Sequence, residues 1–239
     1  KYGLKFKKRI KKIKESFSEE DFILCNYLFS ILISADKGEA IFYDKGVNFE
    51  VLEEIKEKRT PLDKNLVDNY KKMKFTIKSE VDKFRESIYQ NVENTLNNLD
   101  LNKDKVFSIN VPTGTGKTLT SLNTALKLRD KLGLNNRIIY TLPFTSVIDQ
   151  NFSVFEEVLG DLANDSSVLL KHHYLARKEY KTNEAEVYEY DISKYLIENW
   201  DSEIVVTTFV QMINSIFSNK NKNLKKYHNL ANSIIILDE

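Results

Sequence analysis

Apolar and polar residues follow two different patterns along the chain, and the pattern changes near residue 80. From there onward, short continuous apolar runs alternate with stretches in which apolar residues recur every three or four positions. A continuous apolar run between turn residues is typical of a strand buried on both faces, and the longer spacing is typical of a helix with one buried side. This alternation predicts an α/β fold with a parallel sheet covered by helices on both faces.

The apolar runs give the expected order of elements in this half of the chain. Strands are predicted at residues 106–111, 137–142, 167–171, 203–207 and 233–237. Helices are predicted over residues 81–96, over residues 119–132, and from a turn at 143–146 to about residue 159. Gly133 is expected to cap the second of these helices, because glycine adopts the left-handed backbone that ends many helices.

The first part of the chain is expected to be helical and to lack this alternation. The apolar run at residues 22–33 is too short to cross a bilayer, so it predicts a buried helix, with Ser18 and Asp21 as its capping box. Residues 41–78 are rich in Lys and Glu and predict a helical connector. Seven basic residues between positions 5 and 14 fit a solvated helix face, or alternatively a patch for DNA phosphates.

The stretch Pro112-Thr-Gly-Thr-Gly-Lys-Thr118 lies between a predicted strand and a predicted helix. Its two glycines let successive backbone N–H groups turn inward, and the following helix adds the positive end of its dipole, so the stretch predicts a phosphate-binding loop. Lys117 is expected to reach the β- and γ-phosphates of ATP, and the Thr118 hydroxyl is expected to bind magnesium. The residues expected to contact the nucleotide phosphates are Thr113, Gly114, Thr115, Gly116, Lys117 and Thr118.

Two carboxylates follow the last apolar run, at Asp238 and Glu239. Such a pair alone is usual in a solvated turn, but a phosphate loop 121 residues earlier (238 minus 117) gives it a chemical role. Asp238 is expected to hold the magnesium ion, and Glu239 is expected to activate the attacking water, with Lys117 as the other catalytic residue. Gln90 is a candidate for reading the adenine edge, with an exposed helical glutamine as the alternative.

Four stretches in order resemble the signature helicase–nuclease of type I CRISPR systems. They are the phosphate loop at 112–118, Tyr140-Thr-Leu-Pro-Phe-Thr-Ser-Val-Ile-Asp-Gln150, residues 199–211, and His228-Asn-Leu-Ala-Asn-Ser-Ile-Ile-Ile-Leu-Asp-Glu239. The loop itself has Val111 where the general phosphate-loop pattern has glycine, and this form is similar to that of superfamily 2 helicases. The resemblance implies an incomplete first RecA-like motor lobe that uses ATP and magnesium.

The resemblance also implies the function and partners of the full-length protein. They are ATP-driven translocation and unwinding of single-stranded DNA, coupled to DNA degradation, with a CRISPR RNA-guided surveillance complex as partner. Thr145 and Ser146 at a helix start, and Thr207 and Thr208 after a strand, would contact the phosphates of the strand. Hydroxyls and helix N–H groups bind phosphate without reading sequence, although the same residues also suit helix capping.

The family places a metal-dependent His-Asp nuclease ahead of the motor, and residues 28–36 resemble its last helix. Asp36 would then be the final ligand of a divalent transition metal. The histidines of the chain are His172, His173 and His228, all far downstream, so the other ligands are expected before Lys1 or on another fragment. The sequence assigns no role to the His172–His173 pair, for which a structural contact or a DNA-facing surface is expected.

Composition narrows the remaining possibilities. A net charge of +1 excludes a uniformly basic nucleic-acid binder, and the single cysteine favours a reducing, cytoplasmic setting. No membrane partner is expected. The chain is expected to be a piece of a longer protein, with the end of a nuclease domain at 1–45, a linker at 46–78 and the motor lobe at 79–239. Another superfamily 2 motor, such as an RNA helicase or a restriction motor, and a nucleotide-dependent scaffold module remain alternatives.

Overall fold

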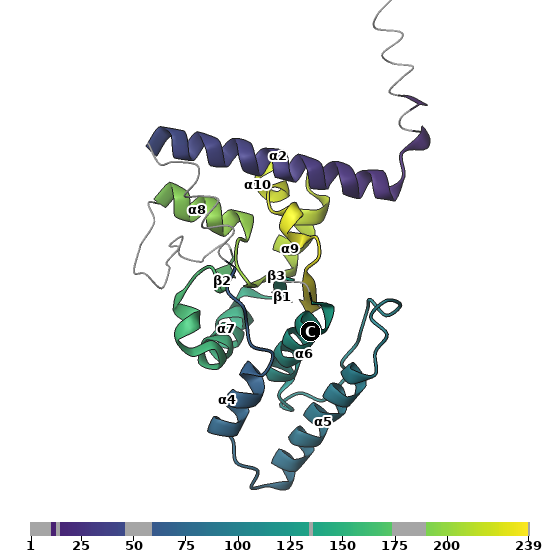
Figure 1. Ribbon diagram of the computed structural model, residues 1–239, viewed down its shortest axis with the longest axis vertical. Helices are drawn as coiled ribbons and strands as arrows, with labels where there is room; N and C mark the ends of the chain where they lie inside the picture. Colours follow the sequence, from purple (N-terminus) through teal and green to yellow (C-terminus); the bar gives the residue numbers. More distant parts are fainter. Residues whose placement is uncertain (1–10, 13–14, 46–58, 134–135, 174–189, 239) are drawn as a thin grey trace, which may run out of the picture.

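A four-stranded parallel sheet forms the centre of the molecule, with helices on both of its faces (Figure 1). The computed structural model describes residues 11–12, 15–45, 59–133, 136–173 and 190–238. The strand order is β2-β3-β1-β4, and the strands are β1 (Ile138–Leu142), β2 (Leu169–His172), β3 (Ile204–Thr208) and β4 (Ile234–Leu237). The predicted α/β class is confirmed, and these strands agree with four of the predicted apolar runs to within two residues.

Two helices cover one face of the sheet, and a third helix packs against both of them. Alternate residues of β1 and β3 point to this side, including the fully buried Tyr140 and Val206, because successive side chains of a strand point to opposite faces. They pack against Leu122 and Phe155, which are also fully buried. The two covering helices are α6 (Lys117–Leu132) and α7 (Thr145–Leu159), and the third is α4 (Leu66–Lys74).

The opposite face carries a second apolar cluster around the fully buried Trp200. The intervening strand residues Ile139 and Val205 belong to it, and Tyr195 packs with them. The elements on this side are α8 (Tyr190–Asn199), α9 (Phe209–Phe217), α10 (Asn221–Leu224) and the 3-10 turn η2 (Tyr227–Leu230). The core therefore has two layers, one on each side of the sheet.

Local end signals explain where several helices begin and end. Helix α5 (Glu80–Asn97) starts with a capping box between Ser79 and Asp82, and α6 ends at Gly133, whose φ of 60° is left-handed as expected. Helix α7 ends before Gly160, where the 3-10 turn η1 (Gly160–Asn164) begins. These predicted helices are confirmed.

The predicted strand at residues 106–111 is wrong. The segment is not assigned to any strand, and the side chains of Val106 and Phe107 are 92% and 40% exposed. A strand requires a hydrogen-bonded neighbour, and this segment is not among the ladder partners of the sheet. On β4 the side chains of Ile235 and Leu237 are likewise exposed. The segment therefore has the apolar composition of a strand but lacks the hydrogen-bonded neighbour that a strand requires.

Helix α2 (Glu19–Lys45) confirms the predicted helix and corrects its predicted burial. Ser18 and Asp21 form the expected capping box, with each backbone N–H donating to the other side chain at 3.0 and 3.1 Å. Most of its large apolar side chains are exposed, however, Leu32 at 63% among them. The buried residues include Ser30 and Ser34, at a four-residue spacing, which therefore line the side that contacts the body.

Those two serines attach α2 to the elements beneath it, at the top of Figure 1. Ser30 Oγ lies 2.9 Å from His228 Nδ1 of η2, and the His228 backbone N–H donates to the same hydroxyl at 3.0 Å. Ser34 Oγ lies 3.0 Å from the Tyr195 hydroxyl of α8. Small polar residues permit this close approach, and Ile33 is the large apolar residue of the run that is buried beside them.

The predicted connector contributes directly to the core. Within α4, Val67 is fully buried and Tyr70 is nearly so, both in the cluster that contains β1. The other expected amphipathic piece, at residues 51–55, lies outside the described residues. The division at residues 45 and 78 stays a prediction. No helix among the described residues is long and apolar enough to span a bilayer.

A buried ion cluster joins distant segments at the amino end of β3. The Glu203 side chain, directly before β3, is 1% exposed and accepts from Arg129 Nη2 at 2.6 Å and from Arg59 Nη2 at 2.7 Å. Burial lowers the pKa of Arg129, and the nearby Glu203 carboxylate opposes that shift. The cluster thus joins the segment ahead of α4 to the end of α6 and the start of β3.

Candidate nucleotide-binding site

The loop at residues 112–116 ends where α6 begins. Gly114 and Gly116 have φ values of 76° and 87°. This left-handed backbone conformation is strained for residues that have a Cβ atom. The Thr115 hydroxyl donates to the Pro112 carbonyl at 2.7 Å, a hydrogen bond within the loop that stabilises the turn. Gly116 is the N-cap of α6 and carries no side chain, so the first N–H groups of the helix face outward without a side-chain cap. This geometry suits an anion.

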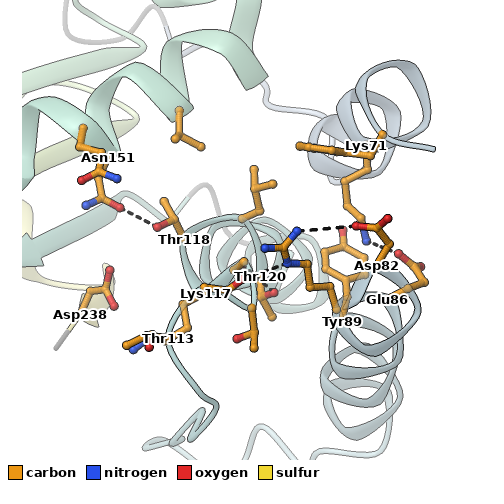
Figure 2. Close-up of a pocket in the computed structure, with 18 of the residues that line it drawn as sticks. Lys71, Asp82, Glu86, Tyr89, Thr113, Lys117, Thr118, Thr120, Asn151 and Asp238 are labelled. Carbon is orange, nitrogen blue, oxygen red and sulfur yellow. Dashed lines mark hydrogen bonds and ion pairs between the residues drawn. The ribbon is translucent and has the colours of Figure 1, made fainter. Parts of the chain in front are cut away.

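A cavity of about 470 Å³ lies against this loop, at the end of α6 where Lys117 and Thr118 stand (Figure 2). Its volume is in the range of ordinary small-molecule sites. The lining comes from the loop, from the segment after α4, from α5, from α7 and from the end of β4. Residues from these elements include Thr113, Gly114, Thr115, Gly116, Lys117, Thr118, Phe75, Ile77, Arg85, Tyr89, Asn151 and Asp238.

Asp238 reaches the same cavity from the end of β4. Its backbone N–H donates to the Thr141 carbonyl at 3.0 Å, and its carboxylate accepts a hydrogen bond from the Tyr140 hydroxyl. Figure 2 shows Asp238 on the same side of α6 as Thr118 and Asn151. A carboxylate and a hydroxyl oxygen are ligands that magnesium prefers, so the residues present fit that ion. Glu239, the expected water-activating acid, lies outside the described residues.

Asn151 of α7 is a site residue that the sequence analysis missed. Thr118 Oγ1 donates to Asn151 Oδ1 at 2.7 Å, and Asn151 Nδ2 donates to the Val147 carbonyl at 3.0 Å, which sets the orientation of the amide. Its side chain is buried. The signal available in the sequence was a polar residue on the inward side of a predicted helix, which by itself does not identify a partner 33 positions away.

The far end of the cavity is aromatic and charged. Tyr89 donates to Asp68 Oδ1 at 2.7 Å, and burial together with that carboxylate raises the pKa of Tyr89 strongly. Lys71 Nζ lies 3.1 Å from the centroid of the Tyr89 ring and 2.8 Å from a Glu86 carboxylate oxygen. These contacts hold α4 against α5. The Tyr89 ring thereby forms an aromatic wall of the cavity beside the loop.

Gln90, the expected adenine contact, lies on α5 next to this wall. Its side chain is exposed and donates to Glu86 Oε1 at 3.1 Å. The residues lining the cavity include Glu86 and Tyr89 on the same helix but not Gln90. Its role stays a prediction, and the aromatic ring of Tyr89 is the wall component that sequence reasoning missed.

The four hydroxyl residues expected to contact DNA lie at the carboxyl ends of β1 and β3, which are neighbours in the sheet. Thr145 and Ser146 are exposed in the first turn of α7, where the N-cap residue makes no side-chain cap. Thr207 is buried and donates to the His172 carbonyl at 2.7 Å. Thr208 caps α9 by accepting from the Gln211 N–H at 3.2 Å.

The adjacent histidines have different environments. His172 Nδ1 accepts from Trp200 Nε1 at 3.0 Å and thus makes a structural contact with the second core layer. The pKa of His173 is lowered, chiefly by burial, so its neutral form is favoured. Neither histidine belongs to a cluster of three or more metal-ligating side chains in the part of the chain that the structure describes.

Asp36 lies on α2, away from the cavity. Its side chain is 72% exposed and is 3.8 Å from Lys37 Nζ. Since the described residues contain no group of three or more His, Cys, Asp or Glu side chains able to hold a metal, they do not by themselves fit a transition-metal centre. The assignment of Asp36 as a metal ligand stays a prediction.

Comparison with known proteins gives two matches. The family model described as "Type III restriction enzyme, res subunit" matches residues 58–239. A curated protein of Haloferax volcanii, the CRISPR-associated nuclease/helicase Cas3, is 34% identical over 151 residues. That match covers 59% of this chain and 16% of the relative's length, so the chain spans a small part of it. The resemblance based on four sequence stretches is therefore confirmed.

Proposed function

We propose, from the premise that this chain belongs to the family of the type III restriction enzyme res subunit, that it is the ATP-binding lobe of a motor that moves along single-stranded DNA. The family and the Cas3 relative support a superfamily 2 helicase that uses ATP and magnesium. Translocation and unwinding require the full-length protein. The isolated piece is expected to be inactive.

One observation carries the proposal. Lys117, Thr118 and Asp238 come from two elements 121 positions apart (238 minus 117) and line a single cavity beside an uncapped helix start. Open parallel sheets bind ligands at the carboxyl ends of their strands, where Asp238 lies. A cation, a hydroxyl, a carboxylate and free N–H groups together suit a magnesium-bound polyphosphate.

The roles follow from the chemistry of each group. Lys117 is assigned to the β- and γ-phosphates, while Thr118 and Asp238 are assigned to the magnesium ion. That ion would neutralise charge that develops on the phosphate oxygens. Glu239, one residue past Asp238, is assigned to the attacking water. The wall formed by Phe75, Ile77 and Tyr89 offers apolar surface for the nucleoside, and Gln90 remains the candidate for its adenine edge.

The same edge of the sheet is assigned to DNA. Thr145 and Ser146 offer exposed hydroxyls and helix N–H groups to phosphate, and Thr207 and Thr208 follow on the neighbouring strand. Such contacts grip the backbone and carry no base pattern. Because Thr207 and Thr208 already make internal hydrogen bonds, the exposed pair is the more accessible part of this assignment.

The finer context comes from the relative's printed name. A CRISPR-associated nuclease/helicase suggests that the full-length protein degrades DNA in the cytoplasm after recruitment by an RNA-guided surveillance complex. Within this proposal Asp36 is a ligand of the nuclease metal, whose other ligands lie outside the described residues. An Asp36→Ala variant that still cleaves single-stranded DNA at the normal rate with manganese would remove Asp36 from the nuclease.

The direct test replaces Lys117 in the full-length protein. Lys117→Ala should weaken binding of a fluorescent ATP analogue and abolish phosphate release, because the cation facing the phosphates is lost. Lys103→Ala is the matched control, since that side chain is 84% exposed and pairs only with the nearby Asp100 among the described residues. Equal affinity and turnover in Lys117→Ala and wild type would overturn the proposal. A wild-type protein that binds the ATP analogue but shows no DNA-stimulated ATP turnover would instead favour a scaffold module.

The acid assignment has a separate test. Glu239→Gln should retain nucleotide binding and lose turnover by about 10²–10⁴-fold, the range for a lost general base. Turnover within a few-fold of wild type would reduce Glu239 to a structural acid.

A further inference from the structure

One side chain of α5 contacts the phosphate loop directly. Arg85 Nε donates to the carbonyl oxygen of Gly114 at 2.9 Å, across 29 positions of sequence. Arg85 also lines the cavity between the loop and the aromatic wall. Its side chain is half exposed, so the contact is made at the mouth of the site rather than in the core.

The hydrogen bond fixes one peptide unit of the loop. In a planar trans peptide, the carbonyl and the N–H of the next residue point in opposite directions. A Gly114 carbonyl turned toward Arg85 therefore turns the Thr115 N–H away from α5. Rotation of this peptide changes ψ of Gly114 and φ of Thr115, and Gly114 has no Cβ to restrict the first of these torsions. The Arg85 hydrogen bond stabilises the orientation that the loop has.

Arg85 is itself held in place. Its Nη1 lies 3.7 Å from Asp82 Oδ1, and the other oxygen of Asp82 accepts from the Ser79 backbone N–H at 3.0 Å in the capping box. One turn further along α5, Tyr89 is anchored to Asp68 of α4. The guanidinium is thus positioned by the start of a helix that is fixed to the rest of the lobe.

We propose that Arg85 is a positioning residue that holds the Gly114–Thr115 peptide in the orientation required for triphosphate binding. The inference rests on the proposed function, since it assumes that the loop binds the phosphates of a nucleotide. Arg85 acts through the backbone of the loop, so its effect extends to any ligand that carries the triphosphate, whether or not a nucleoside is attached.

The experiment measures affinity for ATP and for inorganic tripolyphosphate in the full-length protein. Arg85→Ala should weaken both by a similar factor of about tenfold or more, the scale of one lost charge-assisted hydrogen bond. In steady state, KM for ATP should rise while kcat changes little, because an oriented loop binds ground state and transition state alike. Lys83→Ala is the matched control, since Lys83 is a cation of the same helix turn with its side chain 64% exposed.

Four results would overturn the inference alone. A loss for ATP alone would make Arg85 a nucleoside contact, and no loss for either ligand would leave the hydrogen bond without a role. An equal loss in Lys83→Ala would assign the effect to net charge. A fall in kcat at constant KM would place Arg85 in the reaction itself. A wild type that binds neither ligand overturns the proposed function, and this inference with it, whereas the first four results leave the proposed function intact.

Discussion

At the scale of single residues, the hydroxyl of Thr118 shows how a site residue is set before any ligand arrives. A hydroxyl that binds a metal through its oxygen keeps its proton, and the proton needs an acceptor. Asn151 Oδ1 is that acceptor at 2.7 Å, and its amide cannot turn without losing the bond from Nδ2 to the Val147 carbonyl. The oxygen lone pairs of Thr118 are thereby left available on the other side.

Replacing Asn151 by leucine tests this arrangement. Asn151→Leu keeps a similar volume and removes the acceptor. The factor by which magnesium increases ATP affinity should therefore be about five- to tenfold smaller than in the wild type, the scale of one lost hydrogen bond. The measurement is a nucleotide titration with and without magnesium. Asn151→Asp retains the acceptor oxygen and should stay closer to wild type. An unchanged magnesium effect in Asn151→Leu would contradict the role.

The residues of the site differ in how far the sequence could predict them. Lys117, Thr118 and Asp238 follow from local motifs, because each stands at a fixed position beside a strand or helix end. Asn151 and Arg85 act through partners 33 and 29 positions away, and contacts at such separations depend on how helices pack. No periodicity in a single sequence encodes that distance.

At the scale of elements, the sequence predicted features that depend on a few neighbouring residues. The predictions were wrong where contact with another segment of the chain decides the structure. The predicted helix ends at Ser18 and Gly133 follow from the side-chain and backbone chemistry of a few residues. The segment 106–111 has the composition of a strand but lacks a hydrogen-bonded neighbour. For α2 the apolar run predicted burial, yet small residues on the opposite side made the contact with the body.

The ion cluster at Glu203 gives a stability prediction at this scale. Glu203→Gln leaves the buried Arg129 and the adjacent Arg59 without their carboxylate, so it should lower the free energy of unfolding by about 3–5 kcal/mol. Urea denaturation monitored by circular dichroism measures this change. The control is Asp130→Asn, whose exposed pairing with Lys64 is expected to contribute about 1 kcal/mol or less. Similar urea denaturation midpoints for both variants would show that the ion cluster does not stabilise the fold.

At the scale of the whole molecule, the carboxyl edge of the sheet gathers both proposed ligands. Asp238 follows β4 and lines the cavity beside the loop, while Thr208 is the last residue of β3 and Thr145 follows β1 on the same edge. In the strand order β1 lies between β3 and β4, so Thr145 follows the strand next to β4, and Thr208 lies one strand further from the proposed nucleotide site. Helix α7 touches both, because it starts at Thr145 and carries Asn151 less than two turns later.

A double substitution at the start of α7 tests the proposed grip on DNA. Thr145→Val with Ser146→Ala removes two exposed hydroxyls and should weaken single-strand binding by about tenfold, equally on poly-dT and on a mixed sequence. Wild-type affinity should fall with salt, since phosphate contacts release counterions. Ser153→Ala, on the same helix but bonded to its own turn, is the control. A sequence-dependent loss would contradict a grip on the backbone.

The attachment of α2 has a consequence for how the protein responds to denaturant. Because its contact with the body centres on Ser30, Ser34 and the buried Gly38, while Leu28 and Leu32 already face outward, detaching the helix would expose less new apolar surface than its composition suggests. The urea dependence and the heat-capacity change of an opening both scale with the surface exposed. Amide hydrogen exchange in α2 should therefore depend weakly on urea and temperature, and exchange in β1 and β3 steeply.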